Sequence, residues 1–115
     1  MNKEKTWITI DEPLLSLSII KSIADEEKNE IINTAMKDSM TVLKIIQISK
    51  VPKTSGYRKV KALIRDGLLI PDGYITTRDR KKVTKYRSLF ENVNIAIEKN
   101  KVTVSIVTST SILAT

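Results

Sequence analysis

The chain has 115 residues, with 20 Lys or Arg against 13 Asp or Glu, so its formal net charge is +7 at pH 7. This length is typical of one domain with one small core. The absence of Cys and His excludes disulfides, thiolate or imidazole metal sites, Cys nucleophiles and acid–base chemistry by His. We therefore expect no metal and no other cofactor.

Enzymatic activity is not expected either. No motif places a nucleophile beside a base, and the acidic residues cluster where a helix N-terminus accounts for them. A nuclease that holds Mg²⁺ with carboxylates would need acids in the basic part of the chain, where only Asp66, Asp72 and Asp79 occur.

The chain also has no feature of a membrane protein. No apolar run approaches the roughly 18 residues of a membrane span. Three acids, Glu4, Asp11 and Glu12, surround the short apolar stretch near the N-terminus, which argues against a signal peptide. We expect a cytoplasmic, nucleoid-associated protein with no membrane partner.

The basic residues are concentrated in the middle of the chain. Residues 1–40 hold 5 basic and 8 acidic residues, residues 41–90 hold 13 and 3, and residues 91–115 hold 2 of each. Such a block favours a polyanionic partner, because neutralising phosphates releases counterions. The apolar periodicity within the block distinguishes it from a disordered basic tail.

Three helices are expected before residue 50. The first spans about ten residues from Leu14 and is opened by Pro13. The second covers about 25–37, with three acids at its start and one apolar face. The third follows Thr41 as N-cap, although its many β-branched residues leave a strand possible.

A fourth helix should run from about Lys53 to Arg65 and stop at Gly67, because Pro52 can begin a helix but not sit inside one. One stripe of this helix is apolar, and the other side carries Thr54, Ser55, Arg58, Lys61 and Arg65. Two short helices joined by a tight turn, the second of them basic, describe a helix-turn-helix.

Two β-hairpins are expected in the second half of the chain. Strand 68–76, interrupted by a turn at residues 71–73, pairs with strand 82–90, and their exposed tip is strongly basic, as expected of a wing that contacts DNA. A two-residue turn at Lys99-Asn100 pairs Glu98 with Lys101. The aliphatic pairs Ile97–Val102, Ile95–Val104 and Val93–Ile106 then share one face.

Residues 14–90 resemble the winged helix-turn-helix transcriptional regulators of the ArsR-like and MarR-like kind, especially the compact archaeal versions. The segments "SIADEEKNEIINTA", "MTVLKIIQISKVPKTSGYRKVKALIRDGLL" and "GYITTRDRKKVTKYRS" carry the resemblance. They correspond to the helix before the motif, the helix-turn-helix itself and the wing. The resemblance implies an α+β, mainly helical fold and a duplex DNA partner.

The resemblance also implies which residues meet DNA. Base contacts would come from the start of the recognition helix, with Arg58 as the favoured reader because guanidinium can bind a guanine edge in bidentate fashion. The implied DNA-binding residues are Lys53, Thr54, Ser55 and Arg58 at bases; Lys59, Lys61 and Arg65 at phosphates; Thr41 and Lys44 at the backbone; and Arg78, Arg80, Lys81 and Lys82 on the wing.

The chain departs from the family pattern at several positions. Lys50 stands where Gly is common in the turn, and is strained if that position needs a positive φ. Ile46 replaces a usual Ala at the helix crossing. Gly56 lies inside the recognition helix, where it would ease a close approach to DNA. Without Cys or His, the thiolate metal sensing of many ArsR-like proteins cannot operate.

The sequence therefore predicts a winged helix-turn-helix domain at residues 1–90. Residues 91–115 would be a C-terminal hairpin and tail that belongs to this domain or forms a dimer interface. The expected function is that of a homodimeric, sequence-specific duplex DNA-binding transcriptional regulator with recognition helix 53–65 and wing 77–82. The alternatives are a winged-helix protein-interaction module and a non-specific architectural DNA binder. Operator, target genes, effector, direction of regulation and dimer surface are not specified by the sequence.

Overall fold

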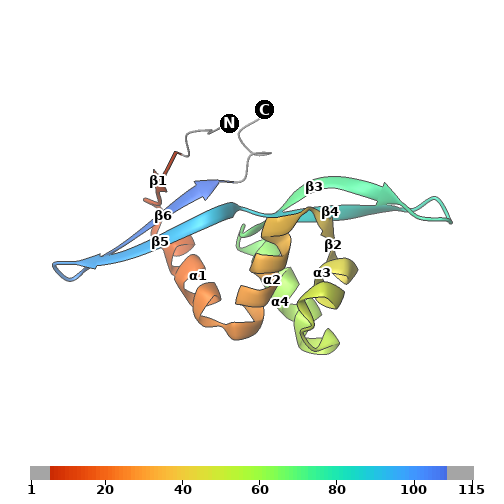
Figure 1. Ribbon diagram of the computed structural model, residues 1–115, viewed down its shortest axis with the longest axis horizontal. Helices are drawn as coiled ribbons and strands as arrows, with labels where there is room; N and C mark the ends of the chain where they lie inside the picture. The colour runs from red at the N-terminus through yellow and green to blue at the C-terminus, as the bar shows by residue number, and fades with distance from the viewer. Residues whose placement is uncertain (1–5, 109–115) are drawn as a thin grey trace.

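The computed structural model describes residues 6–108, which form an α+β fold of four helices and two small antiparallel sheets (Figure 1). The helices are α1 (Pro13–Ala24), α2 (Glu26–Lys37), α3 (Val42–Ser49) and α4 (Lys53–Arg65). The strands are β1 (Ile8–Thr9), β2 (Met40–Thr41), β3 (Leu69–Thr76), β4 (Lys82–Ser88), β5 (Phe90–Glu98) and β6 (Lys101–Thr108). None of the helices in this range is long and apolar enough to cross a membrane.

Side-chain caps explain where the first two helices begin. Pro13 opens α1, and the Glu12 carboxylate accepts the Leu15 amide at 2.8 Å. Asp25 ends α1 and caps α2 by accepting the Lys28 amide at 2.9 Å. Both helices occur where the sequence predicts them, because an N-cap acceptor and a fixed proline φ are local signals.

Helix α3 resolves the ambiguity left by its β-branched residues. The Thr41 hydroxyl accepts the Lys44 amide at 3.3 Å, which confirms the expected N-cap. The helix ends at Lys50, which adopts the left-handed conformation with φ of 61°. The positive φ considered for this lysine is therefore present. It costs conformational free energy, because a residue with a Cβ atom is strained in the left-handed region.

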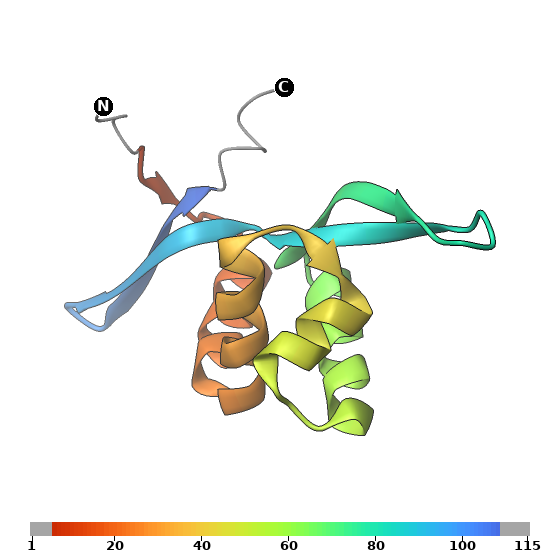
Figure 2. The ribbon, with the colours of Figure 1, turned by 45° about the vertical axis from the view of Figure 1, so that its right-hand side comes forward.

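The six strands form two sheets, in the orders β2-β4-β3 and β1-β6-β5. Only Leu89 separates β4 from β5, so one extended stretch of chain serves both sheets. The buried Ser88 hydroxyl donates to the Phe90 carbonyl at 2.7 Å, where the chain passes between the sheets. The β3–β4 and β5–β6 hairpins consequently project in opposite directions from the helices (Figures 1 and 2).

Two strand features differ from expectation. Strand β2 was not expected; its two residues pair with β4, Met40 with Tyr86 and Thr41 with Lys85. The predicted turn at residues 71–73 is a register irregularity inside the continuous strand β3, at which Gly73 has φ of 79°. The pairing of residues 93–106 follows the predicted register in full, with Lys99-Asn100 as its turn.

One hydrophobic core joins all four helices to both sheets. Its buried members are Ile19, Ile31, Ile32, Ala35, Ile45, Ile46, Val60, Leu63, Leu68, Leu69, Phe90, Val104 and Ile106. Val104 and Ile106 anchor the base of the C-terminal hairpin in this core, and β1 pairs with β6. The second sheet therefore contains strands from both sides of the domain boundary expected near residue 90.

Candidate nucleic-acid interface

Helix α4 packs against the core through its apolar stripe. Val60 and Leu63 are buried, and the half-buried Tyr57 and Ile64 pack beside them. The four positions follow the three- and four-residue spacing of one helix face, which is the stripe that the sequence predicts. The opposite side of α4 is thereby left toward solvent.

Gly56 lies on the inner side of α4, where it is buried against α3 and the turn. A Cβ atom at this position would lie 2.8 Å from Cγ2 of Val51 and 3.4 Å from Cγ2 of Ile46. The expectation that Gly56 eases the approach of DNA is wrong, because its absent side chain makes room for α3. The large Ile46 and the small Gly56 compensate each other at the helix crossing.

The outer side of α4 carries an exposed row that we call the α4 outer face. Its members are Thr54, Arg58, Lys61 and Arg65, while Lys53 is exposed at the start of the helix, beside the turn that follows α3. Arg65 lies 3.2 Å from the carboxylate of the adjacent Asp66. Among residues 6–108, Lys53, Arg58 and Lys61 have no acidic partner within ion-pair distance. These three cations are therefore available to an anionic ligand.

Lys59 and Ser55 face α2 and do not belong to that row. The Lys59 ammonium lies 3.0 Å from the nearest carboxylate oxygen of both Asp25 and Glu27. The half-buried Ser55 hydroxyl donates to the Pro52 carbonyl at 3.4 Å. Residues four apart share one side of a helix, so both side chains point inward together. The expectation that Ser55 projects with the outward residues is corrected here, and Lys59 is an ion-pair residue between α4 and α2.

The charge of Lys59 and the charges of Asp25 and Glu27 stabilise each other. The amide of Lys28 and the ammonium of Lys59 hold the pKa of Asp25 below its ordinary value of 3.8. Hydrogen bonding from the Lys59 ammonium lowers the pKa of Glu27, and the two carboxylates raise the pKa of Lys59. The pair of acids and the lysine all stay charged at neutral pH, which fixes α4 against the start of α2.

Helix α3 presents a second set of exposed residues beside α4. Lys44 is exposed, whereas the Thr41 hydroxyl is occupied as the helix cap. An open groove between the two helices is lined by Leu43, Ile46, Gln47, Lys50, Val51 and Lys53. Gln47 and Lys50 were not among the predicted DNA-binding residues. The sequence does indicate that they lie near Lys44, because Gln47 comes one helical turn after it and Lys50 ends the same helix.

The tip of the β3–β4 hairpin is organised by one threonine. The Thr77 hydroxyl accepts the Lys81 amide at 3.1 Å and donates to the Asp79 carboxylate at 2.8 Å. Around this framework the four predicted wing cations are all exposed: Arg78, Arg80, Lys81 and Lys82. The Lys82 ammonium lies 4.7 Å from the ring centre of the exposed Tyr74, a contact that the sequence alone did not suggest.

A polar network holds the base of the same hairpin. The Asp72 carboxylate accepts hydrogen bonds from the Ser39 hydroxyl and from Arg87 Nε, the latter at 3.1 Å. Hydrogen bonding by Ser39, with the nearby Arg87 charge, keeps the pKa of Asp72 below its ordinary 3.8. The network joins the segment between α2 and β2 to both strands, so it fixes the hairpin relative to the helices.

The basic elements lie on one half of the molecule. In two views, α3, α4 and the β3–β4 tip lie on the same side, away from the β5–β6 tip (Figures 1 and 2). Across residues 6–108, no three metal-ligand side chains of the Asp or Glu type gather in one place. The arrangement offers cations, hydroxyls and amide groups for binding.

Comparison of the chain with protein-family models, with curated protein sequences and with solved structures finds no match.

Proposed function

We propose that the protein is a sequence-specific duplex DNA-binding transcriptional regulator whose α2–β4 segment is a winged helix-turn-helix. In this proposal α4 is the recognition helix in the major groove and the β3–β4 tip is the wing. DNA is its partner in the nucleoid, and the protein is not an enzyme and needs no cofactor.

The observation that supports this proposal most strongly is the division of basic residues on α4. The inward Lys59 has two carboxylates beside it, whereas the outward Arg58 and Lys61, and Lys53 at the helix start, have none among the described residues. A basic helix that served only solubility would not need to segregate its unpaired cations on one side. An unpaired row of this kind is suited to a row of phosphates and to the major-groove edge of bases.

The order of elements supports the winged-helix interpretation. Helix α2, strand β2, helices α3 and α4, and the β3–β4 hairpin follow one another, and β2 closes the sheet against β4. A tight turn at Lys50 joins α3 to α4, as in a helix-turn-helix. The basic tip of the hairpin lies on the same half of the molecule as α4 (Figure 2).

Roles follow from chemistry and position within the proposal. Arg58, exposed near the start of α4, is the candidate base reader, because guanidinium binds guanine in bidentate fashion. Lys53 and Thr54 would meet neighbouring bases. Lys61, Arg65 and Lys44 would meet phosphates, as would the wing cations. Lys59 and Ser55 act instead by positioning α4, because their polar atoms are turned to other protein groups.

Selection from a randomised duplex library at about 150 mM salt tests the proposal. Enrichment of a defined motif is expected; a homodimer would select a two-fold motif with half-sites about one helical turn apart. Binding without enrichment, with a steep dependence on salt, would replace sequence-specific regulation with architectural binding. Absence of any binding would overturn the DNA assignment and favour a protein-interaction module.

A further inference from the structure

The distal half of the β5–β6 hairpin carries apolar side chains beyond the core. On one face of this hairpin, Val104 and Ile106 are buried against the helices. Farther out on the same face, Ile97 is 77% exposed and its cross-strand partner Val102 is 50% exposed. A two-stranded hairpin is only marginally stable in water. Apolar side chains that continue beyond the core cost free energy when they remain exposed to solvent.

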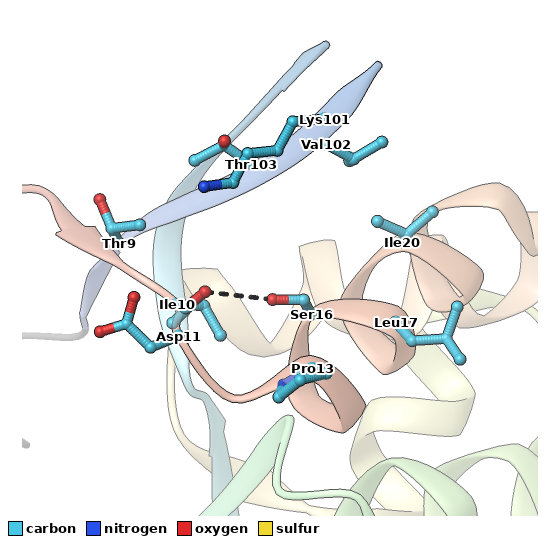
Figure 3. A pocket seen from close by; sticks show the side chains of 10 residues that line it. All are labelled: Thr9, Ile10, Asp11, Pro13, Ser16, Leu17, Ile20, Lys101, Val102 and Thr103. Atoms are coloured by element: carbon cyan, nitrogen blue, oxygen red, sulfur yellow. Dashed lines mark hydrogen bonds between the residues drawn. The ribbon is translucent and has the colours of Figure 1, made fainter. Parts of the chain in front are cut away.

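Helix α1 adds apolar residues beside this row. Leu14 is 72% exposed, and the half-exposed Leu17 lines a groove with Pro13 and Ile20 on one side and Val102 on the other. Figure 3 shows Val102 on β6 and, across the groove from it, Ile20 and Leu17 on α1. We call Leu14, Leu17, Ile97 and Val102 the α1–hairpin patch. Leu17 and Val102 line the same groove, Leu14 lies one helical turn before Leu17, and Ile97 is paired with Val102. Exposed apolar residues placed together in this way mark an interaction surface.

Hydrogen bonds hold the backbone that lines the bottom of this groove in place. The Ile10 amide donates to the Val104 carbonyl at 2.8 Å, and the Ser16 hydroxyl donates to the Ile10 carbonyl at 3.3 Å (Figure 3). These bonds tie the segment between β1 and α1 to β6. The patch is therefore held in shape before any partner arrives, which lowers the entropic cost of binding.

We infer that the occupant of the α1–hairpin patch is a second copy of this chain, arranged with two-fold symmetry. The hairpin tip of each copy would lie across the α1 start of the other. The surface around the patch carries charges of both signs: Lys99 and Lys101 outnumber Glu98 at the tip, Asp11 and Glu12 precede α1, and Lys101 and Asp11 both line the groove. A two-fold axis brings each cationic tip to an acidic α1 start and repeats the same contact twice.

The position of the patch also favours a second copy. The hairpin tip lies at the opposite end of the molecule from the basic β3–β4 tip (Figure 1). Two copies joined through the patch therefore keep their strongly basic regions apart, which avoids repulsion between like charges. A partner rich in acids would be attracted to that basic half rather than to the apolar patch.

Sedimentation equilibrium of the full chain without DNA tests this inference, and its outcome is independent of the proposed DNA contacts. The wild type should have twice the mass of the chain. Ile97→Lys and Leu14→Lys should each weaken self-association by about 30-fold or more, the loss expected for a central interface residue. Leu43→Lys and Ile75→Lys are matched controls at exposed aliphatic positions outside the patch, and should leave the dimer intact. Circular dichroism verifies that each variant is folded.

The absence of native Cys allows the orientation to be tested directly. One preparation would carry Lys99→Cys and another Asp11→Cys; the two would be unfolded together, refolded and oxidised. Cross-linked dimers should form between the two variants in the mixture much faster than in either preparation alone. A monomeric wild type, or dimers that ignore Ile97→Lys and Leu14→Lys, would overturn the inference. Cross-linking no faster in the mixture would overturn the tip-to-α1 arrangement.

Discussion

Gly56 of α4 and Ile46 of α3 are complementary in size: the missing side chain of one gives room to the other at the crossing of the two helices. A Cβ atom added at Gly56 would lie 3.4 Å from Ile46 Cγ2 and only 2.8 Å from Val51 Cγ2. Helix propensity would favour Ala by about 1 kcal/mol, but overpacking costs about 1 to 3 kcal/mol. The packing of α3 on α4 therefore decides whether an Ala at this position stabilises or destabilises the protein.

Gly56→Ala should therefore lower the free energy of unfolding by about 1 kcal/mol, measured by urea denaturation, as the balance of overpacking against helix propensity. In a Val51→Ala background the nearest obstructing methyl is gone. There, Gly56→Ala should be neutral or stabilising. Equal losses in both backgrounds would show that the Val51 contact is not the cause.

Substitution of Lys59 should lower stability, whereas substitution of Lys61 should weaken DNA binding. Lys59→Met removes the ammonium that joins α4 to Asp25 and Glu27, so it should lower the urea midpoint. Lys61→Met should leave stability within about 0.5 kcal/mol of the wild type, as at most exposed positions.

In measurements of DNA binding, the substitution of Lys61 should have the larger effect. Lys61→Met should reduce the slope of log K against log salt by about 0.9 for one lost phosphate contact. Both variants lose one positive charge, so the change in net charge is matched. A larger loss of salt dependence in Lys59→Met than in Lys61→Met would contradict the assignment of the two faces.

Acid should destabilise the protein through its paired carboxylates. The pKa values of Asp25 and Asp72 lie below 3.8 in the folded state. Their contribution is therefore fully present above about pH 3.8 and is lost as the pH falls through the lowered folded values. Asp72→Asn should flatten the fall of the urea midpoint in this window, because one of these groups no longer titrates. An unchanged acid profile would show that the lowered pKa of Asp72 does not contribute to the loss of stability in acid.

Arg58 should determine specificity, and Lys82 should not. Arg58→Ala should cost about 1 to 3 kcal/mol on the selected site and relax the preference at one base position, whereas Lys82→Ala should weaken binding to all duplexes alike. Fluorescence anisotropy on the selected and a scrambled duplex measures both. Equal losses on the two duplexes for Arg58→Ala would exclude it as a base reader.

Local signals account for what the sequence predicts correctly. The bounds of α4 follow from Pro52 and Gly67, and the β5–β6 register follows from the sorting of aliphatic residues onto one face. Both patterns lie within one element or one hairpin. The N-caps at Asp25 and Thr41 are equally local, because the acceptor and its amide are three residues apart.

Features made by distant residues were not predictable in the same way. The inward direction of Lys59 depends on Asp25, which is 34 residues earlier in the chain, and on Glu27. Strand β2 exists because β4 lies beside it, and Asp72 accepts hydrogen bonds from Ser39 and Arg87, which come from other segments. Charge counts along the chain could not separate paired from unpaired lysines on one helix.

The most direct test of the central claim compares two double variants with the same change in charge. Arg58→Ala with Lys61→Ala removes two cations from the α4 outer face, and Lys21→Ala with Lys37→Ala removes two exposed cations from α1 and α2. The binding of a labelled duplex would be titrated across a range of salt concentrations. The first variant should bind at least about tenfold more weakly, with a salt slope lower by about 0.9 for the lost phosphate contact of Lys61, while the second should resemble the wild type. Equal effects of the two variants would contradict DNA binding through α4.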